Sequence, residues 1–385
     1  MNEHEMLEDL EKIREIDAHD LLGAQQSFPS FLEEALRLSK QVKIPRTKRL
    51  GNLRLEYRKP LNLIVAGMGG SAIAGDVAKD WLKDRLPIPM EVCRSYGLPV
   101  YAGPKTLVIV ESYSGNTEEA ISCLLEALRR RCMVFTVSSG GSLLRISLEL
   151  GIPSLQIPAK VPAPRASLPF LLVPIAVLLS KFGLISPRFN SSEIRGAARL
   201  LKELVGELGP EAGVEINQAK QIATKLVDTI PIVYAPESLR SAALRFKTQL
   251  NENSKVLAKY DVFPELNHNE AIGWDAPPRL TSIFTVLFIS REQEREEMKE
   301  RMRVVKDEFI AAKASRIVEI EARGKSVLQQ LLSSIYIGDM ASFYLAILYR
   351  VDPVSTKVFR LVKHGVEQRL NVISRVEEQI RSLVR

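Results

Sequence analysis

The stretch LNLIVAGMGGSAIAGD, residues 61–76, decides the fold of this chain. Its first six residues form an apolar run that is typical of a buried parallel strand, and residues 73–86 carry apolar side chains at helical spacing. Between them, Gly67, Gly69 and Gly70 let the backbone turn tightly and let a ligand approach the peptide groups. The stretch therefore predicts a strand, a glycine-rich turn and a helix whose unpaired N–H groups can bind an anion.

Two other interpretations of this turn stay open. Gly67, Gly69 and Ala72 match G-x-G-x-x-A, which is a weak signal for dinucleotide binding. The second predicted strand ends near residues 91–95 without an acidic residue placed for a ribose, although Arg94 could face a 2′-phosphate. A nicotinamide enzyme is therefore one rival, and a turn that serves only strand–helix packing is another.

Length and composition indicate a two-domain globular protein. A chain of 385 residues is too long for one ordinary core. Its residues are 46% hydrophobic and 26% charged, which is typical of a soluble protein. The net charge of +7 suits an anionic ligand. Lys and Arg are scattered among Asp and Glu, however, which argues against nucleic acid as a partner.

The distribution of apolar and sulfur-containing residues bears on the compartment. The N-terminus is acidic and lacks the apolar core of a signal peptide. The most apolar run, residues 170–179, is too short to span a bilayer and contains a proline, so it predicts a buried helix. Cys93, Cys123 and Cys132 lack metal-ligand spacing. We therefore expect a cytoplasmic protein with reduced, buried thiols and no membrane partner.

Strands and helices alternate outward from the opening stretch. Strands are predicted at residues 61–66, 89–94, 106–111, 132–137 and 154–157, and again at 230–235, 280–289 and 316–321. Such alternation predicts doubly wound parallel sheets, which bind ligands at the carboxyl ends of their strands. Amphipathic helices are expected over residues 3–45, and a polar linker at 183–192. The expected division is an N-terminal helical segment at 1–55, a first domain at 56–190, and a second domain at 191–385 that includes the C-terminal helices.

The loop after the third strand reads ESYSGNTEEA, residues 111–120. Ser112, Ser114 and Thr117 place three hydroxyls around a glycine, directly before a predicted helix. Hydroxyls and the N–H groups of a helix N-terminus suit a phosphate monoester, which accepts many short hydrogen bonds. The other interpretation is helix capping, because Asn116 and the glutamate three residues later match a capping box. Both can hold together, since a cap leaves the remaining donors exposed.

Six motifs together resemble one known family. They are GMGGSAIAGD (67–76), SYSGNTEEA (112–120), VSSGGSL (137–143), PAPR (162–165), LNENSK (250–255) and ELNHNEAIGW (265–274). In combination they resemble the sugar isomerase (SIS) fold and, within it, the bifunctional phosphoglucose/phosphomannose isomerases. The resemblance implies an α/β protein with two SIS-type domains, each a parallel sheet flanked by helices, with N-terminal helices. It also implies a homodimer whose active sites are each built from both subunits. The implied reaction interconverts glucose 6-phosphate or mannose 6-phosphate with fructose 6-phosphate, without metal or other cofactor.

The resemblance implies three catalytic residues. Aldose–ketose isomerisation moves a proton between adjacent carbons through an enediolate, so it needs a base, a ring-opening group and a cation. Glu252 matches the family's base, and Arg165 matches the arginine near the enediolate. His268 matches the ring-opening group, which the neighbouring subunit supplies in the family. Taken singly, these three could instead be a solvated glutamate, a surface ion pair and a structural histidine.

The resemblance also implies the ligand contacts. Gly69, Gly70 and Ser71 of the first turn would bind the phosphorylated hexose together with the three hydroxyls of the loop at 111–120. Thr356 and Lys363 resemble the contacts that tolerate both C2 epimers.

A non-enzyme interpretation stays open beside the isomerase. A phosphosugar-sensing SIS protein that regulates a partner would keep SYSGNTEEA, but it would not need Glu252 and His268 together. It would also carry a DNA-binding or partner-binding module, and none is visible in the sequence.

Overall fold

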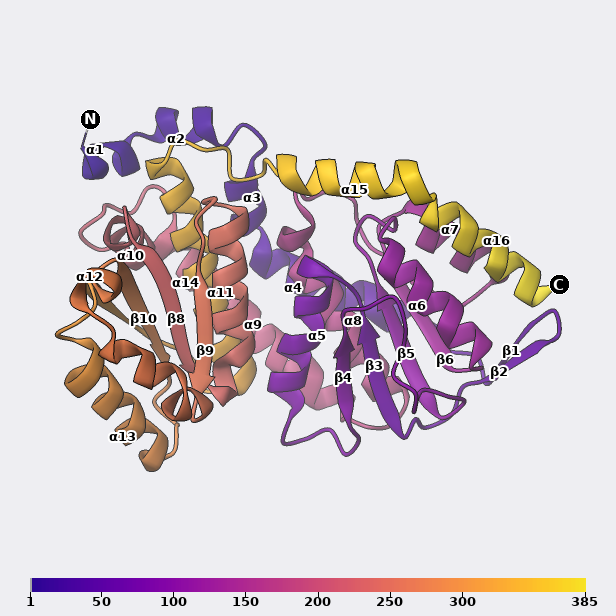
Figure 1. Cartoon of the computed structure of the whole chain (residues 1–385). Helices are drawn as coiled ribbons and strands as arrows, with labels where there is room; N and C mark the ends of the chain where they lie inside the picture. The colour runs from indigo at the N-terminus through magenta and orange to yellow at the C-terminus, as the bar shows by residue number, and fades with distance from the viewer. Residues whose placement is uncertain (1) are drawn as a thin grey trace. The chain divides into compact units, whose positions relative to one another are not determined.

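The computed structural model describes residues 2–385 and contains two compact units, each built around a parallel sheet (Figure 1). The unit of the first sheet comprises Ser30–Arg195 and Thr356–Arg385. The unit of the second sheet comprises the residues up to Pro29 and Gly196–Ser355. Helices cover both sheets, so the protein is α/β, as the sequence predicts.

The first sheet has five parallel strands in the order β4-β3-β5-β6-β7. They are β3 (Asn62–Ala66), β4 (Met90–Cys93), β5 (Thr106–Glu111), β6 (Met133–Ser138) and β7 (Ser154–Gln156). Every end lies within one residue of its prediction. All residues of the central strands β5 and β6 are buried. The helices around this sheet are α5 (Gly69–Leu82), α6 (Glu118–Arg129), α7 (Gly141–Leu150) and α8 (Leu168–Lys181).

The second sheet has four parallel strands in the order β11-β10-β8-β9. They are β8 (Ile230–Pro236), β9 (Lys259–Phe263), β10 (Phe284–Ser290) and β11 (Arg316–Glu321). The helices of this unit are α10 (Gln218–Leu226), α11 (Arg240–Glu252), α12 (Pro278–Thr281), α13 (Glu296–Val304), which continues into a π-helical turn (Val305–Ile310), and α14 (Val327–Leu348). Strand β9 has no clear signal in the sequence, because this edge strand pairs with β8 alone and buries only Phe263 fully.

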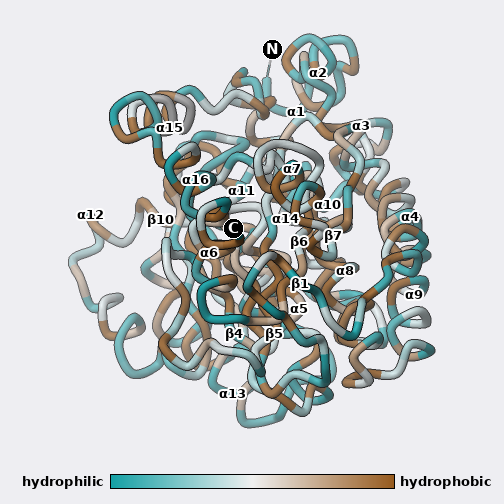
Figure 2. Tube along the Cα trace, turned by 90° about the vertical axis from the view of Figure 1, so that its right-hand side faces the viewer, coloured by the Kyte–Doolittle hydropathy of each residue, from teal (hydrophilic) through white to brown (hydrophobic). Residues whose placement is uncertain are grey.

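Two helices pass the length and composition test for a membrane span. One runs from Pro164 to Lys181, where α8 follows a short turn, and the other is α14. The structure buries 83% and 94% of their most apolar windows. A helix that is apolar all round and buried inside a protein is typical of a core. Figure 2 shows the hydrophobic residues that run along α8.

The ends of the chain pack differently from the prediction. Helices α1 (Glu3–Glu8), α2 (Leu10–Ile16) and α3 (Leu21–Gln26) belong to the second unit, and α4 (Phe28–Gln41) begins there. A hairpin of β1 (Thr47–Leu50) and β2 (Leu53–Glu56) takes the place of the end of the expected helical segment. Helices α15 (Lys357–Leu370) and α16 (Val372–Val384) belong to the unit of the first sheet, not to that of the second. There α16 packs on α6 and α7, and Arg381 Nε lies 3.1 Å from Glu149 Oε1.

The predicted linker at residues 183–192 is wrong over most of its length. Helix α9 (Pro187–Leu208) begins inside it. The polar residue Asn190, which suggested a loop, is 1% exposed. Its Nδ2 donates to the carbonyl of Ala176 at 2.7 Å and to Ser180 Oγ at 2.6 Å, both in α8. A polar side chain therefore serves helix packing here, because a buried backbone carbonyl and a hydroxyl accept from its amide N–H groups.

Candidate functional site

Three loops meet at the carboxyl end of the first sheet, and glycines let them approach. A Cβ on Gly67 would lie 2.9 Å from the carbonyl oxygen of Glu111, and one on Gly70 would lie 2.9 Å from the Cα of Arg165. Any side chain at these positions would collide with the neighbouring backbone. The turn after β3 is thereby packed against the end of β5 and against the PAPR segment. These glycines therefore pack loop against loop, which is more than strand–helix packing, and they bring Arg165 and the end of β5 beside the turn.

Helix α5 begins at Gly69, whose φ is +49°, and its first turn contacts the hydroxyl loop. Met68 is the N-cap and makes no side-chain capping bond. The backbone N–H of Tyr113 donates to Ser71 Oγ at 3.3 Å. Ser71 is buried, so this bond fixes the glycine turn beside the loop that follows β5.

The hydroxyl loop forms a local network at the start of α6. The hydroxyls of Ser112 and Thr117 lie 2.8 Å apart, and the N–H of Gly115 donates to Ser112 Oγ at 3.1 Å. Ser114 is exposed, and its Oγ accepts from the N–H of Asn116 at 3.3 Å. The structure therefore brings Ser71, Ser112 and Thr117 together and leaves Ser114 at the surface.

The predicted capping box is not formed. Helix α6 begins at Glu118, and its N-cap Thr117 makes no side-chain capping bond. Asn116 Oδ1 instead accepts from the N–H of Ser142 at 2.9 Å, in the first turn of α7. The glycine-rich loop after β6 comes close enough for this bond, since a Cβ on Gly115 would lie only 1.8 Å from the carbonyl oxygen of Gly140. The first N–H groups of α6 are left without a side-chain cap, as an anion site requires.

Two arginines of this unit, Arg165 and Arg94, lie in different surroundings. Arg165 is 2% exposed and lies in a 3-10 turn (Pro164–Ser167) beside the glycine turn. Arg94, which a 2′-phosphate would need, instead pairs with the buried carboxylate of Asp76 in α5. This internal ion pair counts against the nicotinamide alternative.

Sequence reasoning missed Glu111, the last residue of β5. Both of its carboxyl oxygens are buried and have no hydrogen-bond partner among the described residues. Burial raises the pKa of Glu111 well above its ordinary value. Burial therefore favours the neutral form of the carboxyl group that lies directly before the hydroxyl loop. The sequence signal that could have identified Glu111 is its position, because it is a charged residue at the end of an apolar strand.

In the second unit, the LNENSK motif ends helix α11. Asn253 Nδ2 donates to Ser342 Oγ at 2.9 Å, and Ser254 Oγ donates to the carbonyl of Ser342 at 2.7 Å. Lys255 has a φ of +61°, and its Nζ donates to the carbonyl of Glu252 at 2.6 Å. These residues bind the helix end to α14, which leaves Glu252 half-buried at the last position of α11.

A buried ion pair joins the same two helices. Arg245 of α11 and Asp339 of α14 are 1% and 0% exposed in their side chains. Arg245 Nη2 donates to Asp339 Oδ2 at 2.7 Å, and its Nε donates to Oδ1 at 3.0 Å. The two parallel bonds set the position of α11, and hence of its last residue.

His268 is exposed at the end of a 3-10 turn (Glu265–His268) that follows β9. The next residues hold this loop in place. Glu270 Oε1 accepts from Tyr234 Oη and from Lys259 Nζ, each at 3.1 Å. Trp274 Nε1 donates to the same Tyr234 hydroxyl at 3.1 Å. Glu270 and Trp274 therefore support the loop.

The topology separates Glu252 from His268 within one chain. Because β8 and β9 are parallel, α11 returns the chain to the amino end of the sheet before β9 begins. Glu252 thus lies at the amino end and His268 at the carboxyl end of β9. Five residues of strand span about 16 Å. One chain does not bring these two side chains into contact.

The remaining predicted ligand contacts are the N-cap of α15 and a residue within that helix. Thr356 is its N-cap and makes no side-chain capping bond. Lys363 lies within α15, and its side chain falls outside the described residues. Over residues 2–385, no group of three or more His, Cys, Asp or Glu side chains is arranged to hold a metal ion.

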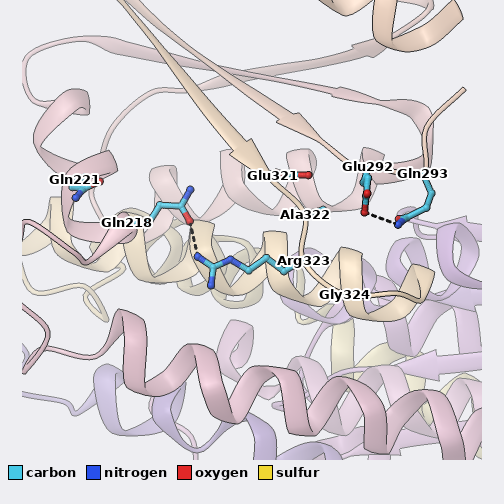
Figure 3. Close-up of a pocket in the computed structure, with 8 residues that line it drawn as sticks. All are labelled: Gln218, Gln221, Glu292, Gln293, Glu321, Ala322, Arg323 and Gly324. Atoms are coloured by element: carbon cyan, nitrogen blue, oxygen red, sulfur yellow. Dashed lines mark hydrogen bonds between the residues drawn. The ribbon is translucent and has the colours of Figure 1, made fainter. Parts of the chain in front are cut away.

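A polar hollow of about 560 Å³ lies beyond β10 and β11 in the second unit (Figure 3). Its lining includes Gln218, Gln293, Glu292 and Arg323. Arg323 Nη2 donates to Gln218 Oε1 at 3.4 Å, and Gln293 Nε2 donates to Glu292 Oε2 at 3.0 Å. These groups are paired with one another, and none of the predicted site residues lines the hollow.

Both the sequence and the fold of this chain match known proteins. Residues 215–365 match the bacterial phospho-glucose isomerase C-terminal SIS domain. The chain is 35% identical over 307 residues to the bifunctional phosphoglucose/phosphomannose isomerase of Caldicellulosiruptor bescii, covering 80% of this chain and 89% of that protein. It is 32% identical over 338 residues to the protein of the same name from Thermoplasma volcanium, covering 87% and 99%. A solved hypothetical protein from Thermus thermophilus shares the fold, with a TM-score of 0.66 at 16% identity and 94% of each chain covered.

Proposed function

The chain belongs to the bifunctional phosphoglucose/phosphomannose isomerase family, and from this premise we propose which of its residues carry the reaction. It is an aldose–ketose isomerase that interconverts glucose 6-phosphate and mannose 6-phosphate with fructose 6-phosphate. The regulatory alternative is disfavoured, because the relatives that match most of this chain are named as enzymes. The observation that carries the residue assignment is the meeting of three loops around the uncapped start of α6.

The phosphate is assigned to the carboxyl end of the first sheet. The N–H groups at the start of α6 would donate to it, with the hydroxyls of Ser112, Ser114 and Thr117. Gly69, Gly70 and Ser71 would line the sugar side of the same turn. The first turn of α6 carries acidic residues, but the carboxylate of Glu118 accepts from the Tyr96 hydroxyl at 2.6 Å.

The proton transfer is assigned to Glu252. The base takes the proton from C2 of the aldose and returns it to C1, and the enediolate between the two steps carries a negative oxygen. Arg165 is the proposed cation, because a guanidinium stays charged even when it is 2% exposed. His268 is the proposed ring-opening group, and its exposure lets it reach a substrate outside its own chain.

We infer that the active site is shared between the subunits of a homodimer. Glu252 and His268 lie at opposite ends of β9 within one chain, so a site that needs both must take them from two chains. Helix α15 offers apolar surface that a second copy could cover. Val358, Leu361 and Val362 are 75%, 73% and 61% exposed. Such a row of apolar side chains on one helix is typical of an interface.

Two further assignments complete the proposal, and the first of them rests on the family alone. Thr356 and Lys363 are proposed to contact the sugar near C2, where glucose and mannose differ. The cytoplasm is the proposed compartment, since the three cysteines are free thiols.

A coupled assay tests the proposed function. Purified protein is given glucose 6-phosphate or mannose 6-phosphate, and fructose 6-phosphate is measured through a second enzyme. We expect product from both aldoses with one and the same protein. If neither aldose gives product, the proposed isomerase function is refuted. If only glucose 6-phosphate gives product, the protein lacks activity on mannose 6-phosphate.

A further inference from the structure

Tyr113, in the hydroxyl loop after β5, is bonded to three other segments of the first sheet's unit. Its N–H donates to Ser71 Oγ at 3.3 Å, in the first turn of α5. Its carbonyl accepts from the N–H of Ser139 at 3.0 Å and from the hydroxyl of the same serine at 2.5 Å, in the loop after β6. Its hydroxyl reaches Val161, in the segment that leads from β7 to the 3-10 turn of Arg165. One residue therefore connects the hydroxyl loop to the glycine turn, to the loop after β6 and to the segment before Arg165.

The hydroxyl of Tyr113 bonds to both polar backbone groups of Val161. The N–H of Val161 donates to Tyr113 Oη at 3.2 Å. Tyr113 Oη in turn donates to the carbonyl of Val161 at 3.4 Å, which is the longer and weaker of the two bonds. Tyr113 is half-buried, and burial raises the pKa of its hydroxyl, so the group keeps its proton at neutral pH. It can therefore donate and accept at the same time.

The segment before Arg165 cannot be held by a regular ladder of backbone hydrogen bonds. Residues 157–163 lie in neither a helix nor a strand. Three of the residues in PAKVPAP, 158–164, are prolines and have no N–H to donate. Val161 is 9% exposed, and a buried backbone N–H needs a partner. The side chain of Tyr113 supplies that partner from another part of the chain.

The glycine turn supports the same segment at its other end. A Cβ on Gly70 would lie 2.9 Å from the Cα of Arg165 and 3.0 Å from its backbone nitrogen. The backbone of Arg165 therefore rests directly on the glycine turn. Val161 comes shortly before it in the chain and is bonded to the hydroxyl loop through Tyr113. The place of Arg165 thus depends on two contacts with the carboxyl end of the first sheet, one of backbone packing and one of a side-chain hydroxyl.

We propose that Tyr113 is a positioning residue for the isomerisation, whose hydroxyl holds the segment of Arg165 at a fixed place relative to the hydroxyl loop. This rests on the proposed function, in which the hydroxyl loop binds the phosphate at C6 and Arg165 stabilises the enediolate at C1 and C2. The two groups lie at opposite ends of the hexose, so the distance between the loop and the guanidinium must match the length of the substrate. Tyr113 sets that distance through Val161 and does not touch the reacting atoms. A displacement of about 1 Å can slow a reaction about a hundredfold.

Tyr113→Phe in the full-length protein removes the hydroxyl and keeps the ring. We expect kcat for the isomerisation of fructose 6-phosphate to fall about tenfold, because the guanidinium is less well placed. The KM of fructose 6-phosphate and the inhibition constant of inorganic phosphate should each change by less than about twofold, because the donors of the hydroxyl loop are unchanged. Tyr101→Phe is the matched control and should keep the wild-type kcat, since its exposed ring donates to Glu91 Oε2 at 2.5 Å. A normal kcat in Tyr113→Phe, or weaker phosphate binding that accounts for the whole loss of activity, would overturn the proposal.

A double-mutant cycle tests whether Tyr113 acts through Arg165. Arg165→Gln removes the positive charge and should lower kcat by itself. In the Arg165→Gln protein, Tyr113→Phe should lower kcat further by less than about twofold, because no guanidinium is left to be placed. The same tenfold loss in both backgrounds would overturn the positioning role and leave the proposed function intact. A normal kcat in Arg165→Gln alone would instead count against the proposed function of Arg165, on which the positioning role depends.

Discussion

Glu111→Gln tests whether a neutral carboxyl group lies beneath the phosphate loop. Burial raises the pKa of Glu111 in the folded protein, so the folded state keeps a proton that the unfolded state releases. The stability that this proton supplies is complete below the unfolded pKa, which is about 4.3, and is lost as the pH rises toward the folded pKa. The glutamine side chain has a similar shape and does not titrate. The wild-type protein should therefore lose stability relative to the variant as the pH rises.

One proton sets the magnitude of this effect. A difference of one bound proton changes the free energy of unfolding by about 1.4 kcal/mol per pH unit. Both carboxyl oxygens are buried and have no described partner, so no ion pair offsets the change. Between pH 5 and pH 7 the wild-type protein should lose up to about 3 kcal/mol relative to Glu111→Gln. Burying an amide in place of the carboxyl group changes the free energy of unfolding by the same amount at every pH. It therefore does not affect the slope of that free energy with pH.

Hydrogen exchange can measure this loss of stability in the compact unit that holds the first sheet. Peptides that cover β5 report the opening free energy of the first sheet, so unfolding of the second sheet does not confuse the reading. The wild-type protein and Glu111→Gln are compared at pH 5, 6 and 7 after correction for intrinsic exchange rates. Glu33→Gln, at an exposed position of α4, is the control and should run parallel to wild type. Parallel profiles for Glu111→Gln as well would refute a neutral buried carboxyl.

Four further outcomes are expected. Glu252→Gln keeps the shape of the side chain but cannot accept a proton. Turnover should therefore fall about a hundredfold or more, with little change in the Kd of fructose 6-phosphate. Near-normal turnover in the variant would show that Glu252 is not the base. Ser114→Ala and Thr117→Ala should each weaken phosphosugar binding by about 1–2 kcal/mol, and an equal loss for an unphosphorylated hexose would show that the loop does not bind phosphate. Chains with Glu252→Gln and chains with His268→Ala, refolded together, should regain near a quarter of wild-type activity. About half of the dimers are then mixed, and each mixed dimer has one intact site. Verified heterodimers without activity would show that both residues act in the site of one chain. Asp339→Ala should lower the free energy of unfolding of the second unit in urea by about 3–5 kcal/mol, because the buried guanidinium of Arg245 loses its carboxylate. A decrease below about 1 kcal/mol would show that the ion pair is dispensable.

Local patterns determined much of the fold of this protein. Buried parallel strands are continuous apolar runs, so the strands of the first sheet were predicted to within one residue. Glycine clusters and hydroxyls marked the loops that follow β3 and β5 at the carboxyl end of the first sheet. These features depend on neighbours in sequence, since a strand, its turn and the next helix are contiguous. The family resemblance rests on the same contiguous motifs.

Tertiary contacts decided the rest. Asn190 suggests a linker in the sequence, yet it lies in α9 because α8 supplies its hydrogen-bond acceptors. Asn116 suggests a cap for its own helix, yet it bonds to α7 because the loop after β6 approaches it. Strand β9 is too polar to predict alone and forms because β8 offers it an edge. Helix α16 belongs to the first sheet's unit because α6 and α7 receive its apolar face. In each case a polar group or an amphipathic segment has several local solutions of similar free energy, and a partner distant in sequence selects one of them.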